Sequence, residues 1–368
     1  MSDVPPLRFP EFSGEWEKRT LEDVSEFSKE RMNTQNLSSD NYVATENMLH
    51  DYQGIIEASS VPTNTNVIKF NKGDVLLSNI RPYLKKVWFA DKNGGCSADV
   101  FVFKALSACI PDFLHYIIAN DRFINFAMSG AKGVKMPRGD KEQMKTYEIG
   151  LPSIEEQKKI AKLLSLLDER ITTQNKIIED LKKLKSAIRK RVFTSLKNEH
   201  TESCEINQLL AYEQPTAYIV ANNEYSTDTT LTPVLTANKG FVLGYTDEDS
   251  GIYQKGECII FDDFTMDAKY VSFPFKVKSS AIKILTAKPN VNLRFMFEYL
   301  SFLGLKSEEH KRHYISEIAS LVIELPSKEK QNIIANLMTS LDNKLALKEK
   351  AEARYEAKKR YLLSQMFI

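Results

Sequence analysis

The chain has 368 residues, 42% of them hydrophobic and 27% charged, and its formal net charge is +1. Two or three domains are expected at this length, and no apolar run approaches the roughly 18 residues that a membrane-spanning helix needs. The N-terminus lacks the pattern of a signal peptide, and the cysteines are scattered without a CxxC pair. These features predict a reduced, cytoplasmic protein without a metal site.

Charge is unevenly distributed along the chain. Residues 1–150 hold 18 basic and 20 acidic residues, and residues 201–325 hold 11 and 17, so both segments are net acidic. Residues 151–200 hold 12 basic and 7 acidic residues, and residues 326–368 hold 9 and 5. The nearly neutral total therefore conceals two basic segments that alternate with two acidic ones.

In the first segment, short runs of β-branched and aromatic residues alternate with turn signals. "VIKFNKGDVLLSNIRPYLKKVWFAD" (67–91) and "SADVFVFKA" (97–105) predict strands separated by Lys-Gly-Asp, Arg-Pro and Asn-Gly-Gly turns. Residues 110–128 follow as one predicted amphipathic helix. This order indicates an α+β domain.

Two basic stretches of this segment are candidates for contact with DNA, because phosphate binding favours lysine and arginine and base contact favours polar side chains. They supply Arg81, Tyr83, Lys85 and Lys86 from one turn, and Lys132, Lys135 and Arg138 from "SGAKGVKMPRGD". A solvated loop is the alternative interpretation of each stretch.

A long helix is predicted from Ser153, a candidate N-cap that acidic residues follow in the first turn. Beyond it, apolar residues recur with the heptad pattern of a coiled coil, interrupted at Gln174 and Lys185. The predicted seam consists of Ile160, Leu164, Leu167, Ile171, Ile178, Leu181 and Ile188.

The second segment has the same style, with predicted strands within 232–245, 253–264 and 270–285 and a helix over 291–303. Its candidate DNA contacts are Lys239, Asp262, Asp263, Lys269, Lys278, Lys311 and Arg312. "FDDFTMDAK" also loosely resembles a metal-dependent nuclease centre. Its carboxylates and lysine crowd into seven residues, however, which favours a polar turn.

The first long helix is then repeated. "GLPSIEEQKKIAKLLSLLDERI" from Gly150 matches "ELPSKEKQNIIANLMTSLDNKL" from Glu324 at a constant offset of 174 residues. The second seam consists of Ile334, Met338, Leu341, Leu345, Tyr355 and Leu362, with polar residues at three intervening heptad positions. Each helix of about 40 residues needs a partner, and the other copy is the obvious one.

These phrases together resemble the specificity (S) subunit of type I restriction-modification systems. "LRFPEFSGEWEKRTLEDV" resembles the N-terminal entry of that family, and "KGDVLLSNIRPYLKKV" with "CSADVFVF" resembles its first target-recognition domain. "TPVLTANKGFVLGYT", "IIFDDFT" and the two "LPS" helices resemble its second domain and its repeated regions. The segment "ESCEINQLLAYEQPTAYI" departs from the pattern, because it lacks the Trp that often opens the second domain.

The resemblance implies an α+β fold with two α/β target-recognition domains linked by a long antiparallel two-helix coiled coil, with pseudo-two-fold symmetry. The expected domains are 1–150 and 201–325, each followed by a helical arm at 151–200 and 326–368. The chain would recognise a bipartite, asymmetric site in double-stranded DNA and dock two methyltransferase (M) and two restriction (R) subunits. S-adenosylmethionine, ATP and Mg²⁺ would belong to those partners, and this chain would not itself be an enzyme.

Two alternatives are open at this stage. A coiled-coil scaffold would join protein partners without contacting DNA, but it would not need basic loops in both domains. A stand-alone nuclease would cleave DNA in the presence of Mg²⁺, with its centre at Asp262, Asp263, Asp267 and Lys269.

Overall fold

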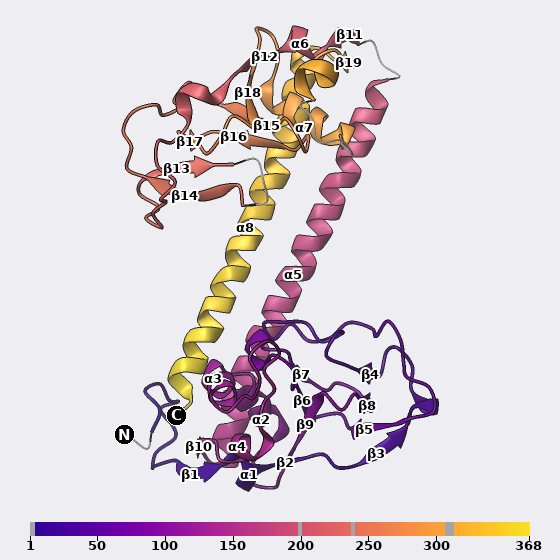
Figure 1. The fold of residues 1–368 in the computed structure, drawn as a ribbon, viewed down its shortest axis with the longest axis vertical. Helices are drawn as coiled ribbons and strands as arrows, with labels where there is room; N and C mark the ends of the chain where they lie inside the picture. The colour runs from indigo at the N-terminus through magenta and orange to yellow at the C-terminus, as the bar shows by residue number, and fades with distance from the viewer. Residues whose placement is uncertain (1–3, 198–200, 237–239, 306–312) are drawn as a thin grey trace. The chain divides into compact units, whose positions relative to one another are not determined.

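The computed structural model describes residues 4–197, 201–236, 240–305 and 313–368 (Figure 1). They form two compact units: unit 1 comprises Met1–Gln174 and Ala351–Ile368, and unit 2 comprises Asn175–Lys350. Two long helices, α5 (Ile154–Leu196) and α8 (Lys328–Met366), contribute to both units. Within the described ranges, no helix has both the length and the apolar character required to cross a membrane.

Unit 1 is built around a four-stranded antiparallel sheet of order β2-β9-β6-β7. Its strands are β2 (Ser25–Phe27), β9 (Val100–Ala105), β6 (Val75–Ser78) and β7 (Val87–Phe89). A second sheet has the order β3-β5-β8-β4, with strands β3 (Arg31–Asn33), β5 (Asn66–Phe70), β8 (Gly94–Cys96) and β4 (Tyr42–Val43). Strands β1 (Glu17–Thr20) and β10 (Glu148–Leu151) form an antiparallel pair, and the short helices are α1 (Leu21–Val24), α2 (Pro111–Ile118), α3 (Asp121–Ser129) and α4 (Lys141–Lys145).

The central sheet of unit 1 is buried on both faces, because successive side chains of a strand point to opposite sides. Val75 and Phe103 join a core that includes residues of α2, α3, α5 and α8. Leu76 and Val102, which alternate with them, join a separate core with residues of β4 and β5. The β6 and β9 sequences therefore read as continuous apolar runs rather than as alternating ones.

The prediction of one helix over residues 110–128 is wrong, because the structure has two helices there, α2 and α3. Asn120 interrupts them in an extended conformation and caps α3 by accepting a hydrogen bond from the Arg122 N–H at 3.0 Å. Its side-chain amide also donates to the Leu363 carbonyl of α8 at 3.4 Å. A capping asparagine within an apolar stretch is thus a local signal for the start of a new helix. The prediction of one helix followed the apolar periodicity of residues 110–128 instead.

Unit 2 repeats the topology of the central sheet of unit 1. Its four-stranded sheet has the order β12-β18-β15-β16, in which each strand corresponds in sequence order to β2, β9, β6 and β7. The strands are β12 (Leu210–Glu213), β18 (Ile282–Ala287), β15 (Cys258–Asp262) and β16 (Ala268–Val271). Strands β11 (Glu202–Glu205) and β19 (Val322–Leu325) pair as β1 and β10 do, and α6 (Ile206–Leu209) and α7 (Leu293–Leu303) take the places of α1 and α2.

The second sheets of the two units differ. In unit 2 this sheet has three strands in the order β14-β13-β17, with β13 (Thr232–Leu235), β14 (Val242–Thr246) and β17 (Lys276–Val277). In unit 1 the corresponding sheet has four strands and encloses residues of its own core. The duplication visible in the long helices therefore extends through the central sheet and stops at the second one.

The same glutamine fastens the start of each long helix to the globular part before it. Gln157 accepts a hydrogen bond from the Ile110 N–H, at the N-cap of α2, and donates to the Pro152 carbonyl, both at 2.9 Å. Gln331, 174 residues later, accepts from the Asn292 N–H at the N-cap of α7 and donates to the Pro326 carbonyl, again at 2.9 Å. Both glutamines are buried.

Helices α5 and α8 exchange ion pairs at equivalent positions of the repeat. In unit 1, Lys359 of α8 lies 2.5 Å from Asp168 of α5. In unit 2, Lys185 of α5 lies 2.5 Å from Asp342 of α8. Lys359 and Asp342 are the residues 174 positions after Lys185 and Asp168. Two lysines that interrupt the apolar heptads are therefore specific partners of aspartates on the other helix.

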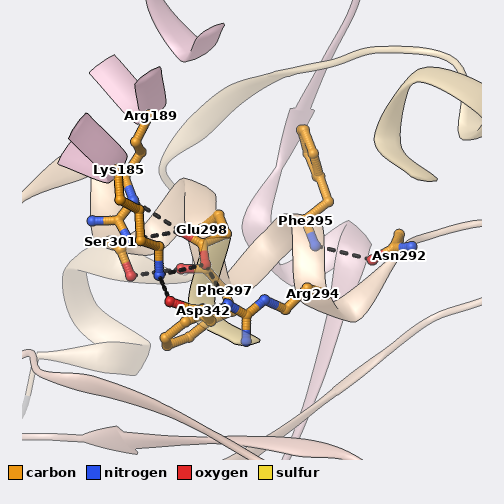
Figure 2. Close-up of polar contacts among 9 residues, drawn as sticks. All are labelled: Lys185, Arg189, Asn292, Arg294, Phe295, Phe297, Glu298, Ser301 and Asp342. Atoms are coloured by element: carbon orange, nitrogen blue, oxygen red, sulfur yellow. Dashed lines mark hydrogen bonds and ion pairs between the residues drawn. The ribbon is translucent and has the colours of Figure 1, made fainter. Parts of the chain in front are cut away.

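A buried glutamate of α7 enlarges the ion pair of unit 2 into a cluster (Figure 2). The Glu298 side chain is 0% exposed and lies within 2.7 Å of both Arg189 and Arg294 and 3.5 Å from Lys185. Arg294 and Lys185 also contact Asp342. A carboxylate that is removed from water is strongly destabilising unless cations such as these compensate its charge.

Unit 1 has a smaller, partly neutral version of this contact. When the N-caps of α2 and α7 are aligned, Tyr116 takes the place of Glu298. The Tyr116 hydroxyl donates to Asp168 at 2.8 Å, and its neighbour His115 is half-buried and stacks on Phe89 with ring centroids 5.1 Å apart. Burial, with a smaller effect of Lys359, lowers the pKa of His115 to about 4.

Replacing Gln157 or Gln331 by alanine should lower the free energy of unfolding by about 1–3 kcal/mol, because a half-buried N-cap N–H loses its acceptor. The measurement is chemical denaturation of the purified chain. Asn343→Ala, at an exposed position of α8, is the matched control. Equal stability of Gln157→Ala and the control would contradict the role assigned to these glutamines.

Acidification should destabilise unit 1 through His115. The folded pKa of about 4 lies below the ordinary value of 6.5, so the contribution is complete above pH 6.5 and disappears as the pH falls toward 4. Its full size is on the order of 3 kcal/mol. His115→Phe should flatten the pH dependence of the unfolding free energy over this window, whereas His50→Gln, at an exposed position, should leave it steep. An unchanged slope in His115→Phe would exclude His115 as the source.

Candidate nucleic-acid interface

The structure brings together the two basic loops of unit 1 that are far apart in the sequence. One loop, residues 79–86, connects β6 to β7, and the other, residues 132–138, lies between α3 and α4. The Arg81 N–H donates to the Pro137 carbonyl at 2.8 Å, and Ile80 and Arg138 form a β-bridge. Sequence spacing alone gave no sign of this contact.

Arg81 lies at the centre of the joined loops. It adopts a left-handed backbone with φ 52° at the start of the 3₁₀ turn η2 (Pro82–Leu84), which turns the chain sharply there. Its Nε is buried and has no hydrogen-bond partner among the residues that the structure describes. A guanidinium in this state retains capacity to bind an anionic group.

The neighbouring lysines are engaged within the unit. Lys85 lies 2.9 Å from the Asp121 carboxylate, and Lys86 donates to the Thr45 carbonyl at 2.6 Å. Tyr83, two residues before Lys85, is exposed. The turn therefore presents the tyrosine outward, while both lysines help to hold the loop against α3 and the segment around Thr45.

In the second loop, two of the three predicted cations have carboxylate partners. Lys132 lies 2.6 Å from Asp140, and Arg138 lies 2.7 Å from Asp99. The Lys132 ammonium and backbone N–H groups at the start of α4 lower the pKa of Asp140. Both cations are largely exposed, and so is Lys135 at the tip of the loop. The carboxylates orient the basic side chains rather than burying them.

The predicted DNA contacts Asp262 and Asp263 do not fit that role, because both side chains are buried. Asp262 accepts hydrogen bonds from the N–H groups of Phe264 and Thr265 and so forms the turn after β15. Asp263 lies 3.3 Å from the buried Lys283 and accepts from the Tyr314 N–H at 2.9 Å. These carboxylates stabilise the inside of unit 2.

The remaining predicted contacts of unit 2 are dispersed. Lys269 is half-buried on β16, and Lys278 is exposed just after β17. Lys239, Lys311 and Arg312 lie outside the described residues. No cluster of three or more potential metal-binding side chains was found in the part of the chain that the structure describes.

The predicted helix seam is buried or half-buried along its whole length in both units. Most of the buried positions lie toward the ends of the helices: Ile160, Leu164 and Leu167 in α5 and Ile334, Met338 and Leu362 in α8. Ile178, near the middle of α5, is buried as well. Leucines on other faces of the helices, such as Leu184 and Leu347, are exposed. The assignment of all these residues to one seam stays a prediction.

Comparison with known proteins agrees with this architecture. The family model of the type I restriction modification DNA specificity domain matches residues 13–183 and again residues 198–356. A type I restriction enzyme specificity subunit of Escherichia coli is 44% identical over 127 residues, which cover 33% of this chain and 31% of that protein. Across three curated specificity subunits, the aligned part covers 31% to 66% of the relative's length.

Two solved structures share the fold. The S subunit of a type I restriction-modification system from M. genitalium superposes with a TM-score of 0.68 at 16% identity, covering 99% of each chain. A chain from a study of complex assembly and conformational transition of the type I restriction-modification system superposes with a TM-score of 0.55 at 17% identity, covering 95% of this chain and 97% of that one. With two matches of the family model spanning most of its length, the chain belongs to the family of type I restriction-modification specificity subunits.

Proposed function

We propose that this chain is the non-catalytic subunit through which a type I restriction-modification complex recognises DNA. The observation that carries the proposal is the exchange of ion pairs between the repeats, in which Lys185 contacts Asp342 and Lys359 contacts Asp168. Surfaces related by a two-fold axis make reciprocal contacts of this kind. They support an antiparallel coiled coil of α5 and α8 with pseudo-two-fold symmetry.

A pair of such helices would set the spacing of a divided DNA site. At 1.5 Å per residue, the 43 residues of α5 extend about 64 Å. Successive major grooves on one face of B-DNA are about 34 Å apart. Two globular parts carried at opposite ends of the helices would therefore bind two half-sites and leave an untouched spacer between them.

The two half-sites would differ in sequence. Both globular parts have the same central sheet, but they differ in the second sheet and in the loops that surround it. The contact between the loops at Arg81 and Pro137 belongs to unit 1, where the Arg81 guanidinium, whose Nε has no partner among the described residues, suits a DNA phosphate. Different loops on a shared frame suit an asymmetric bipartite target.

The partners would supply the chemistry. Two M subunits would dock on equivalent faces of the helices and use S-adenosylmethionine to methylate an adenine in each half-site, while two R subunits would use ATP and Mg²⁺ for translocation and cleavage. Exposed aliphatic residues on the helices, such as Leu166 and Leu337, suit a protein interface. A chain with this fold comes from a study of complex assembly in the type I restriction-modification system, which supports partnering with other subunits of such a system.

The spacer should lengthen when both helices lengthen together. Inserting one heptad after Gln174 and another after Lys348 keeps the seam in register and adds about 10 Å, which corresponds to about three base pairs. Methylated adenines mapped in cells that express the chain and its methyltransferase should then report the same half-sites about three base pairs further apart. An unchanged spacing would exclude the helices as its determinant.

Exchanging residues 201–325 for the corresponding segment of another specificity subunit should change one half-site and leave the other intact. The same adenine mapping measures the result, with co-purification of the methyltransferase as the control for assembly. A change in both half-sites would contradict independent recognition by the two units. If the original chain and the exchanged chain both assemble with the methyltransferase but neither complex methylates a specific sequence, the alternative function, a scaffold without DNA contact, would be favoured.

A further inference from the structure

The tip of the second basic loop carries aliphatic side chains in water. Val134 is fully exposed, and Met136 is 48% exposed. Lys135 between them and Lys132 before them are exposed too. Single exposed aliphatic residues are common on proteins, but a valine fully exposed between two lysines at the end of a loop has no packing role within the chain.

The loop that carries this tip is well supported at its base. Lys132 and Arg138 exchange both backbone hydrogen bonds at 2.9 Å, as a narrow antiparallel pair. The Pro137 side chain is buried, and its carbonyl accepts from Arg81. Gly133 has φ +97°, a conformation that favours glycine and allows the chain to reverse before Val134. The loop is therefore a short ribbon that a single antiparallel pair, Lys132 and Arg138, closes at its base, with residues 133–136 at its end.

A ribbon of this width fits the major groove of B-DNA, which admits a two-stranded element. The one apolar feature that bases present there is the C5-methyl group of thymine, and aliphatic side chains recognise it by contact. The flanking lysines suit the phosphates on either side of the groove. Valine is short and branched, so it matches a single methyl group better than the gap between two stacked bases.

We infer that Val134 reads a thymine in the half-site bound by unit 1, through contact between its isopropyl group and the thymine methyl group. The inference rests on the proposed function and adds to it a residue that determines specificity. The basic side chains of the same loop would position the ribbon, and Val134 would distinguish an A·T pair from the others.

The test uses the assembled complex with its methyltransferase and the target found by adenine mapping. Deoxyuridine replaces thymine, one position at a time, in the half-site assigned to unit 1, which removes only the methyl group. At one position, the wild-type complex should bind about 3- to 5-fold more weakly, as expected for one lost buried methyl group. Val134→Ala should weaken binding to the thymine-containing site by a similar factor and should no longer respond to deoxyuridine.

Controls separate this inference from the proposed function. Ile56→Ala, at another exposed aliphatic position of unit 1, should keep the full response to deoxyuridine. Substitutions in the other half-site should affect wild type and Val134→Ala equally. Binding that is specific but insensitive to deoxyuridine, or a response that persists in Val134→Ala, overturns the inference and leaves the proposed function standing. If the loop instead wedges between bases, binding should be insensitive to deoxyuridine, and the fluorescence of 2-aminopurine placed in the half-site should change. Failure of the complex to bind any specific site counts against the proposed function itself.

Discussion

The pairing of one aspartate and one lysine on each long helix is the contact on which the organisation of the chain depends. Asp168 and Lys185 lie on α5, and their counterparts Asp342 and Lys359 lie on α8, so each helix offers both charges to the other. These residues are half-buried, where a lone charge is costly and a paired one is tolerated. Sliding either helix by one turn would separate both pairs at once, so they specify register as well as partner.

The two long helices could be predicted from the sequence, because they are duplicated, strongly periodic and capped by serine at equivalent positions. The strands of the globular parts were also recognisable from β-branched runs between turns. The common topology of the two central sheets could not be predicted from the sequence. Their corresponding strands share chain order and pairing, but their residues differ. The break at Asn120 has a local signal, its capping side chain, which the apolar periodicity outweighed. The buried state of Asp263 depends on its contact with Lys283, which no local pattern encodes.

The two units connect to the helices with different chemistry despite their common topology. In unit 1, Tyr116 shares Asp168 with a lysine, and a neutral histidine packs beside it. In unit 2, the buried Glu298 collects three cations and shares two of them with Asp342. The first arrangement relies on burial and one hydroxyl, whereas the second relies on complete charge compensation. Substitutions at equivalent positions of the repeat therefore need not be equivalent in cost.

The end of α8 completes the core of unit 1, although it follows the whole of unit 2 in the chain. Phe367 stacks on Phe113 with ring centroids 5.1 Å apart, and Arg122 donates to the Phe367 carbonyl at 2.7 Å. During translation, at about 5–20 residues per second, the apolar side of α2 thus waits roughly twelve to fifty seconds for the residues that cover it. Until those residues have been synthesised, the core of unit 1 lacks Leu362, Leu363, Met366 and Phe367, and the apolar side chains that they cover stay open to water.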